Sequence, residues 1–209
     1  MISHKHKCIF VHIPKCGGSS IEDLLWPREK DRCEANLWMG FIDRYHNKYQ
    51  TGGLQHLFSQ HIRNEVGREV FDSYFKFAIV RNPWDKAVSQ YCYIKQREDL
   101  REYIGMKATD SFEKYLSLIQ LKSHVQWEPQ WKFILDTTDQ LLVDHIGRFE
   151  NFNDEAKEIL NHLNIADQEI PHRKKGTRGN YKDYYNPESI KTIKQMYQRD
   201  IEMFGYSFE

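Results

Sequence analysis

The stretch Ile9–Ser20, with the sequence IFVHIPKCGGSS, joins an apolar run to a lysine, two glycines and two hydroxyl residues. Its β-branched and aromatic start predicts a buried strand. Ser19 or Ser20 can cap a following helix, whose first turn would contain Glu22 and Asp23. A strand, a glycine loop and a helix N-terminus predict an anion site in an α/β fold, because glycines let backbone N–H groups approach phosphate and the helix dipole favours negative charge.

The order of residues in this loop differs from that of a Walker A loop, in which the lysine follows the glycines. Here Lys15 precedes Gly17 and Gly18, and the chain contains no Gly-Lys-Ser or Gly-Lys-Thr sequence. Taken alone, the stretch is also compatible with an ordinary glycine turn between a strand and a helix. Other parts of the chain therefore have to decide its role.

Length and charge limit the classes to which the chain can belong. Its 209 residues suffice for one domain with its own core, and we expect a single domain over residues 1–209. The 30 Lys and Arg residues balance the 30 Asp and Glu residues, which argues against a general nucleic-acid binder. The apolar runs are too short to span a membrane, and the N-terminal residues lack an apolar signal core. We expect neither a nucleic-acid partner nor a membrane span.

The cysteines and histidines suggest no metal site. The four cysteines have no Cys-x-x-Cys spacing, and the ten histidines are scattered without the spacing of metal ligands. We expect free thiols in a reducing compartment and no metal.

A second stretch, Phe75–Tyr91 (FKFAIVRNPWDKAVSQY), repeats the pattern of a strand followed by a helix. Its apolar run ends in Arg81, and Pro83 suits the first position of a helix. Arg81 would lie at the carboxyl end of a strand, where open α/β sheets bind ligands. Ser89 lies about two turns into the helix, on a face that could point back toward the arginine. A guanidinium and a hydroxyl suit a phosphate, although a nearby aspartate could instead neutralise Arg81.

Both stretches resemble motifs of one enzyme family. The loop at residues 13–20 resembles the 5′-phosphosulfate loop of sulfotransferases that use 3′-phosphoadenosine 5′-phosphosulfate (PAPS), in the form found in the carbohydrate branch. Residues 81–91 resemble the 3′-phosphate motif of the same enzymes, and Val143–Glu150 and Asp200–Phe208 resemble further family segments. The resemblance is to the Golgi and bacterial family 2 type, which includes chondroitin/dermatan and heparan 2-O-sulfotransferases. It covers nearly the whole chain and is weakest over residues 28–54.

The resemblance implies a P-loop-like three-layer α/β/α domain with a central, mainly parallel sheet. It also implies transfer of a sulfuryl group from PAPS to an acceptor hydroxyl, most simply on a carbohydrate, with no metal required. A basic loop at residues 171–181 would close over the nucleotide. The residues implied to bind the cofactor are Lys15, Cys16, Gly17, Gly18, Ser19, Ser20, Arg81, Ser89, Lys175, Gly176 and Arg178.

Catalysis by such an enzyme needs a base, because a sugar hydroxyl is a poor nucleophile. Enzymes that resemble this chain use a histidine or a glutamate, and His56 lies at the corresponding place. A histidine suits this role because its unperturbed pKa lies near neutrality. His61 and Glu65 are the alternatives. Lys15 would neutralise the charge that builds on the leaving group, 3′-phosphoadenosine 5′-phosphate.

Two other classes remain open at the level of sequence. A P-loop-type kinase would need the Gly-Lys-Ser/Thr order and an acidic magnesium ligand. A catalytically idle nucleotide- or glycan-binding module would keep the anion loops and lose the base. Many relatives are anchored in Golgi membranes, so we expect either a cytoplasmic enzyme or a trimmed catalytic domain of a membrane-anchored one.

Overall fold

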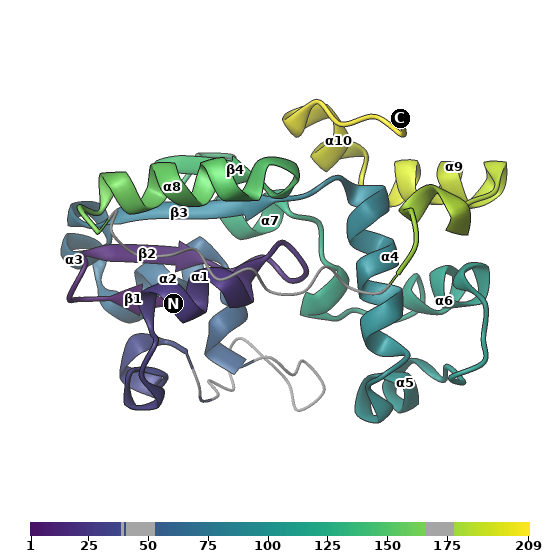
Figure 1. Cartoon of the computed structure of the whole chain (residues 1–209), viewed down its shortest axis with the longest axis horizontal. Helices are drawn as coiled ribbons and strands as arrows, with labels where there is room; N and C mark the ends of the chain where they lie inside the picture. Colours follow the sequence, from purple (N-terminus) through teal and green to yellow (C-terminus); the bar gives the residue numbers. More distant parts are fainter. Residues whose placement is uncertain (39, 41–52, 166–177) are drawn as a thin grey trace. The chain divides into compact units, whose positions relative to one another are not determined.

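The computed structural model describes residues 1–38, 40, 53–165 and 178–209 (Figure 1). The chain divides into two compact units. The first unit contains Met1–Val80 and Gln130–Lys174, and the second contains Arg81–Pro129 and Lys175–Glu209. That these units make up one domain stays a prediction.

A four-stranded sheet forms the centre of the first unit. Its strands are β1 (Ile2–Ser3), β2 (Cys8–Val11), β3 (Phe75–Val80) and β4 (His145–Arg148), and they lie in the order β1-β2-β3-β4. The β2–β3 and β3–β4 pairs are parallel, and the β1–β2 pair is antiparallel. This confirms the expected mainly parallel sheet.

Burial explains why the two central strands are almost entirely apolar. All four residues of β2 are buried, as are the last five of β3. Phe10 and Phe77 are register partners, and their rings stack with centroids 5.1 Å apart. Strands that are covered on both faces have no polar side, so they read as continuous apolar runs rather than alternating ones.

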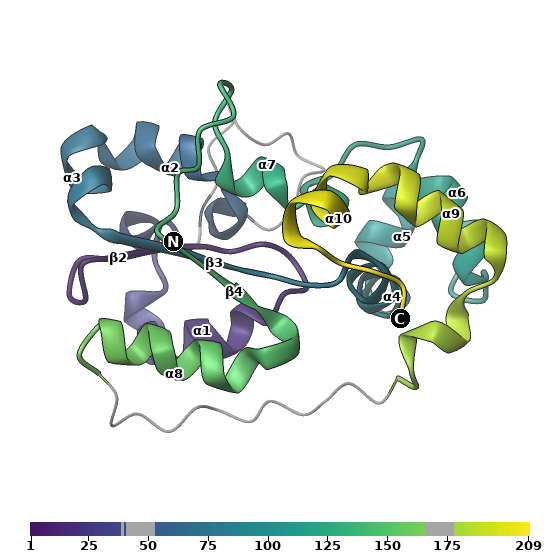
Figure 2. The ribbon, with the colours of Figure 1, turned by 90° about the horizontal axis from the view of Figure 1, so that it is seen from above.

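Helices cover both faces of this sheet (Figure 2). The helices α1 (Gly18–Leu25) and α8 (Phe152–His162) lie on one face. The helices on the other face are α2 (Ser59–Val66), α3 (Arg68–Ser73) and α7 (Trp131–Ile134). The first unit therefore has the expected three-layer α/β/α architecture. Its short 3₁₀ turns are Glu29–Asp31, Glu34–Asn36, Gly53–His56 and Phe149–Asn151.

The second unit is helical. Its buried core is rich in aromatic side chains, including Tyr91, Phe112 and Tyr115. Across the described ranges of the chain, no helix has both the length and the apolar character that a bilayer crossing requires. The helices of this unit are α4 (Pro83–Ile94), α5 (Glu98–Ile104), α6 (Phe112–Ile119), α9 (Pro187–Met196) and α10 (Gln198–Phe204), with 3₁₀ turns at Val125–Trp127 and Tyr181–Tyr184.

Candidate functional site

The loop between β2 and α1 turns through two left-handed residues. Lys15 has a φ of 67° and Gly17 a φ of 84°. Gly17 is the N-cap residue of α1, and no side chain caps this helix end. The expectation that Ser19 or Ser20 caps the helix is therefore wrong, because the left-handed Gly17 starts the helix earlier and places both serines inside its first turn. For the same reason the first turn contains no acidic residue.

This backbone geometry would suit an anion. The N–H groups of Gly18 and Ser19 lie in the first turn of α1, where amides have no intrahelical acceptor. These N–H groups lie at the N-terminus of the helix, which is the positive end of its dipole. Half-buried Lys15 adds a cation to the same loop.

The two glycines of the loop are required for different reasons. Gly17 needs its left-handed backbone, and a Cβ there would lie 2.9 Å from the Phe152 ring. Gly18 is not left-handed, but a Cβ there would overlap the His12 imidazole, well inside the 3.0 Å that real Cβ atoms keep. The backbone of this loop thus lies directly against the side chain of His12, which follows β2, and that of Phe152, which lies in α8.

The Cys16 side chain anchors the loop. It is buried, and its thiol donates to the carbonyl oxygen of Pro14 at 3.6 Å and to Oε1 of Gln130 at 3.4 Å. Its backbone N–H donates to the carbonyl oxygen of Ile13 at 3.4 Å. Both of its donors therefore stabilise the loop itself.

Two histidines and a glutamate form a buried cluster beside this loop. The rings of His12 and His56 lie with centroids 4.5 Å apart, and these residues are 7% and 6% exposed. Nδ1 of His12 lies 3.0 Å from Oε1 of Glu22, which is 6% exposed. This is the distance of an ion pair, although the angles are not those of a hydrogen bond. The structure thus brings His56 and Gly18 together through their common neighbour His12.

The His56 ring has a defined tautomer. Its Nδ1 lies 3.1 Å from the backbone carbonyl oxygen of His12. A carbonyl oxygen can only accept, so Nδ1 carries the proton and the neutral ring has its lone pair on Nε2. The alternative base, His61, stacks on Phe58 with ring centroids 5.0 Å apart.

In the second unit, Arg81 and Arg178 share one carboxylate. Nη2 of Arg81 lies 2.7 Å from Oδ2 of Asp85, and Nη2 of Arg178 donates to Oδ1 of the same side chain. The pairing of Arg81 with an aspartate is the alternative that the sequence left open. Because two guanidinium groups face one carboxylate, the cluster nevertheless keeps a net positive charge.

This cluster lies where an anion would be stabilised. It adjoins the N-terminus of α4, which Asn82 caps by accepting from the N–H of Trp84. Nη1 of Arg178 is buried and has no hydrogen-bond acceptor within the described ranges. In those same ranges the hydroxyl of half-buried Ser89, on α4, makes no hydrogen bond. The remaining predicted cofactor residues, Lys175 and Gly176, lie outside the residues that the structure describes.

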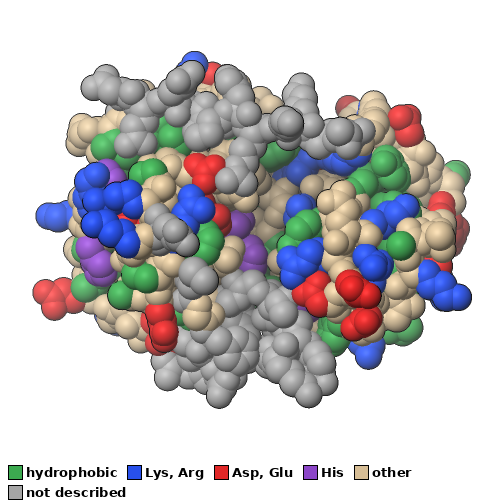
Figure 3. Space-filling view, turned by 60° about the horizontal axis from the view of Figure 1, so that its bottom comes forward, with side chains coloured by type: hydrophobic (Ala, Val, Ile, Leu, Met, Phe, Trp, Pro, Cys, Tyr) green, Lys and Arg blue, Asp and Glu red, His purple; other side chains and the backbone are tan. Residues whose placement is uncertain are grey.

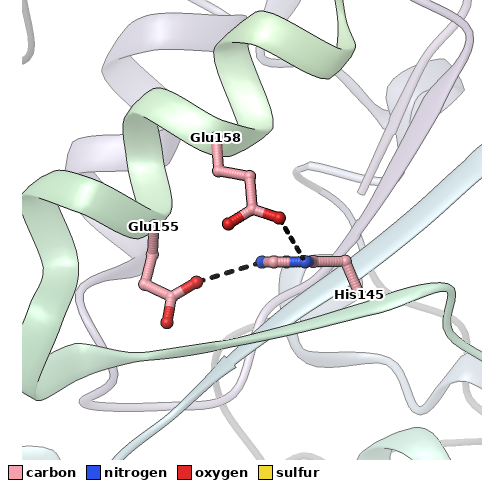
Figure 4. A group of neighbouring side chains, drawn as sticks. All are labelled: His145, Glu155 and Glu158. Atoms are coloured by element: carbon pink, nitrogen blue, oxygen red, sulfur yellow. Dashed lines mark hydrogen bonds and ion pairs between the residues drawn. The ribbon is translucent and has the colours of Figure 1, made fainter.

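A third cluster of titratable side chains, His145, Glu155 and Glu158, joins β4 to α8 in the first unit (Figure 4). Nε2 of His145 lies 3.1 Å from Oε2 of Glu155, and its Nδ1 lies 3.7 Å from Oε1 of Glu158. Each ring nitrogen faces a different carboxylate, so this cluster links a strand to a helix through side-chain contacts. His145 is the first residue of β4, so this cluster lies at the amino end of that strand. The glycine loop instead follows the carboxyl end of β2, which runs parallel to β4 with β3 between them.

Basic and acidic side chains are interspersed on the surface of the second unit, at the right of Figure 3. Arg97 donates to both carboxylate oxygens of Asp99, at 3.0 and 2.7 Å. This pair places a negative charge beside the positive charge of Arg97 at the start of α5. The surface at this end of the helix therefore carries both signs of charge.

The sequence did not single out His12 and Glu22, which complete the first cluster, and it left the aspartate partner of Arg81 without a residue number. A signal for His12 existed, since it is the polar residue that interrupts an otherwise apolar run. Glu22 lies in an amphipathic helix and carried no signal of its own, because only the fold places it against an imidazole. Asp85 follows Arg81 by four residues, a spacing that suggests a pair only if the arginine adjoins the helix.

Comparison with known proteins points to one family. A family model described as a sulfotransferase family matches residues 1–207. Carbohydrate sulfotransferase 10 of Xenopus laevis is 23% identical over 243 aligned residues, which cover 98% of this chain and 66% of that protein. An uncharacterized protein of Archaeoglobus fulgidus is 28% identical over 107 residues, which are 51% of this chain and 82% of that protein. No solved structure matches the chain at a significant level.

Proposed function

Because the chain belongs to the sulfotransferase family, we propose that it transfers a sulfuryl group from PAPS to an acceptor hydroxyl. The observation that carries this proposal is the His56 ring, whose Nδ1–H donates to the carbonyl oxygen of His12 beside the glycine loop. A base with its lone pair on Nε2, next to an anion loop, is what removal of a proton from a hydroxyl requires.

The loop of the first unit would hold the 5′-phosphate of the donor. The amides of Gly17, Gly18 and Ser19 and the hydroxyls of Ser19 and Ser20 are the groups that suit phosphate oxygens there. Lys15 would lie beside the oxygen that bridges phosphorus and sulfur.

The chemistry then needs two charge movements. As the acceptor oxygen bonds to sulfur, its proton passes to Nε2 of His56. As the bond from sulfur to the bridging oxygen breaks, the electron pair stays on that oxygen, and the ammonium group of Lys15 stabilises the new charge. Neither step requires a metal ion.

The arginine cluster of the second unit would hold the 3′-phosphate. Arg81 and Arg178 have guanidinium geometry suited to paired hydrogen bonds with phosphate oxygens, and the Ser89 hydroxyl can donate another. The buried Nη1 of Arg178 supports this role, since a buried donor without an acceptor is costly unless a ligand supplies one. We assign both anion sites to one nucleotide because the two sequence stretches resemble the 5′- and 3′-phosphate motifs of one enzyme family.

The acceptor class rests on similarity. The relative from Xenopus laevis is named as a carbohydrate sulfotransferase, so we assign a glycan hydroxyl as the acceptor. A cytoplasmic location, or derivation from a membrane-anchored enzyme, likewise remains part of this proposal.

Calorimetric titration tests the cofactor first. The ligands are 3′-phosphoadenosine 5′-phosphate without metal, adenosine 5′-phosphate, and ATP with magnesium. We expect the first to bind most tightly, and we expect Arg81→Ala to weaken it about tenfold or more, as loss of a charged hydrogen-bond pair would. Adenosine 5′-phosphate, which lacks the 3′-phosphate, should bind both proteins alike.

The matched control is Arg97→Ala, which removes another arginine that pairs with an aspartate in the same unit. It should leave all three affinities unchanged. Preference for ATP with magnesium, or binding of none of the ligands, would overturn the proposed function and favour a kinase or an idle module.

A further inference from the structure

The His12 side chain occupies the centre of the first unit's site, yet the proposed function gives it no role. Its ring stacks on Phe10 at 5.3 Å between centroids, with an interplanar angle of 14°. The His56 ring and the Glu22 carboxylate contact it from other directions. A ring enclosed in this way has little room to change rotamer, because neighbours in a packed core do not yield freely.

This ring also determines how close α1 can come to the strand. Gly18 and Glu22 are four residues apart and so lie on one face of α1, and His12 reaches both. The φ of Gly18 lies outside the left-handed region, so its backbone would accept alanine. The three heavy atoms nearest to a Cβ at this position all belong to the imidazole of His12.

We propose that His12 is the positioning residue of the site. Its imidazole sets how closely the N-terminus of α1 packs on β2, and therefore where the Gly18 N–H points. Its backbone carbonyl oxygen sets the tautomer of His56. One residue thus aligns the phosphate loop with the base. This inference rests on the proposed function, since it assigns the loop to the 5′-phosphate.

A double-mutant cycle tests the packing step. The proteins are the wild type, Gly18→Ala, His12→Ala and the double variant, each titrated with 3′-phosphoadenosine 5′-phosphate and with adenosine 3′-phosphate. Gly18→Ala should weaken the first ligand about tenfold, the effect of one misplaced charged hydrogen bond, and leave the second unchanged. The double variant should bind the first ligand more tightly than Gly18→Ala does, because the overlapping ring is gone.

Gly17→Ala is the matched control. Its Cβ would meet Phe152 and Phe149 rather than His12, and its backbone is left-handed. His12→Ala should therefore fail to restore binding to Gly17→Ala. Strictly additive effects of Gly18→Ala and His12→Ala, or equal restoration of both glycine variants, would overturn the inference.

His12→Ala leaves the Glu22 carboxylate buried beside an empty space, which could unfold the protein. The cycle is then repeated with Glu22→Gln in every member, which removes that charge. Melting temperatures of the same four proteins report the steric overlap between a side chain at position 18 and the His12 imidazole in the absence of any ligand. If the wild type binds neither nucleotide but the melting temperatures are non-additive, the proposed function fails while the packing role of His12 stands.

The second part of the inference has a spectroscopic readout. Nitrogen-15 NMR of labelled histidine side chains distinguishes the two neutral tautomers, and His56→Gln identifies the His56 signals. We expect the Nδ1–H tautomer in the wild type and also in His12→Ala, because that substitution keeps the backbone carbonyl oxygen which accepts from Nδ1. An Nε2–H tautomer in the wild type, or a mixture of tautomers in His12→Ala, would contradict the positioning of His56 by this carbonyl oxygen.

Discussion

Lys15 adopts a backbone conformation that side-chain-bearing residues usually avoid, with a φ of 67°. Such a residue costs about 1–2 kcal/mol relative to a right-handed one, so it persists only where its surroundings determine it. Here the buried Cys16 thiol, which donates to Gln130, holds the next residue of the turn. This strained residue lies in the loop that leads into α1, where the proposed chemistry needs a cation.

Substitution of Lys15 and of His56 should separate their two roles. Lys15→Ala should abolish sulfuryl transfer, because nothing then neutralises the leaving group. His56→Ala should lower transfer by about 10²–10⁴-fold, the usual contribution of a general base, while the affinity for 3′-phosphoadenosine 5′-phosphate stays unchanged. Both are measured as acceptor-dependent release of this nucleotide from PAPS with a panel of glycans.

His61→Ala is the control for this experiment, since His61 was the other candidate base. It lies in α2, the helix that follows the 3₁₀ turn containing His56. It should retain transfer. Full activity in His56→Ala together with its loss in His61→Ala would reassign the base.

Among the helices, α4 begins with two residues, Asn82 and Pro83, that fix its starting point. The Asn82 side chain accepts from the N–H of Trp84 at 3.0 Å and donates to the carbonyl oxygen of Ser207 at 2.9 Å. Pro83 occupies the first turn, where its missing N–H costs nothing. These residues start the helix directly after Arg81, and therefore hold Asp85 one turn away from that arginine.

Removal of this cap should destabilise the protein measurably. Asn82→Ala should lower the free energy of unfolding by about 1 kcal/mol, as loss of an N-cap does. Asn82→Asp keeps the accepting oxygen and loses the donor to Ser207, so it should recover most of that loss. Urea unfolding measures both, and an Asn82→Asp variant no more stable than Asn82→Ala would show that the Ser207 contact dominates.

At the scale of the whole molecule, several buried acidic groups must stay protonated in the folded state. Burial raises the pKa of the Cys8 thiol from 9.0 to about 12. Burial likewise raises the pKa of the phenol groups of Tyr115, Tyr185 and Tyr197. Unfolding would expose all four groups to water, where they ionise at lower pH.

Alkaline pH should therefore destabilise the fold. A group whose pKa is raised on folding stabilises the protein fully only below its unfolded pKa, and that contribution is lost as the pH rises toward the folded pKa. For Cys8 this window runs from 9.0 to about 12. Within it the free energy of unfolding should fall by about 1.4 kcal/mol per pH unit for this one thiol.

Cys8→Ala isolates the thiol from the other alkaline titrations. Urea unfolding at about pH 8, 9, 10 and 11 gives the free energy of unfolding as a function of pH for the variant and for the wild type. The slopes of these two plots are compared. The variant should have the shallower slope above pH 9, whatever its stability at pH 8. Equal slopes would mean that the Cys8 thiol does not carry a raised pKa.

The sheet, the glycine loop and the strand-end arginine could all be predicted from the sequence, because these features depend on local patterns. An apolar run of strand length, glycines before a helix, and a proline after Arg81 each restrict the backbone within a few residues. The loop thus lies where the pattern put it, although Gly17 rather than a serine starts α1. The starting residue of α1 depends on the left-handed φ of Gly17, which the amino-acid sequence does not specify.

The pairing of side chains in the two clusters became visible only in the folded chain. Glu22 is ten residues from His12, His56 is 44 residues from it, and Arg178 is 93 residues from Asp85. In the first unit such contacts depend on how α1 packs on the sheet, and in the second unit on how the chain returns to α4. A local sequence pattern contains no information about either arrangement. Burial then makes these pairs obligatory, since a carboxylate or guanidinium removed from water must find a partner.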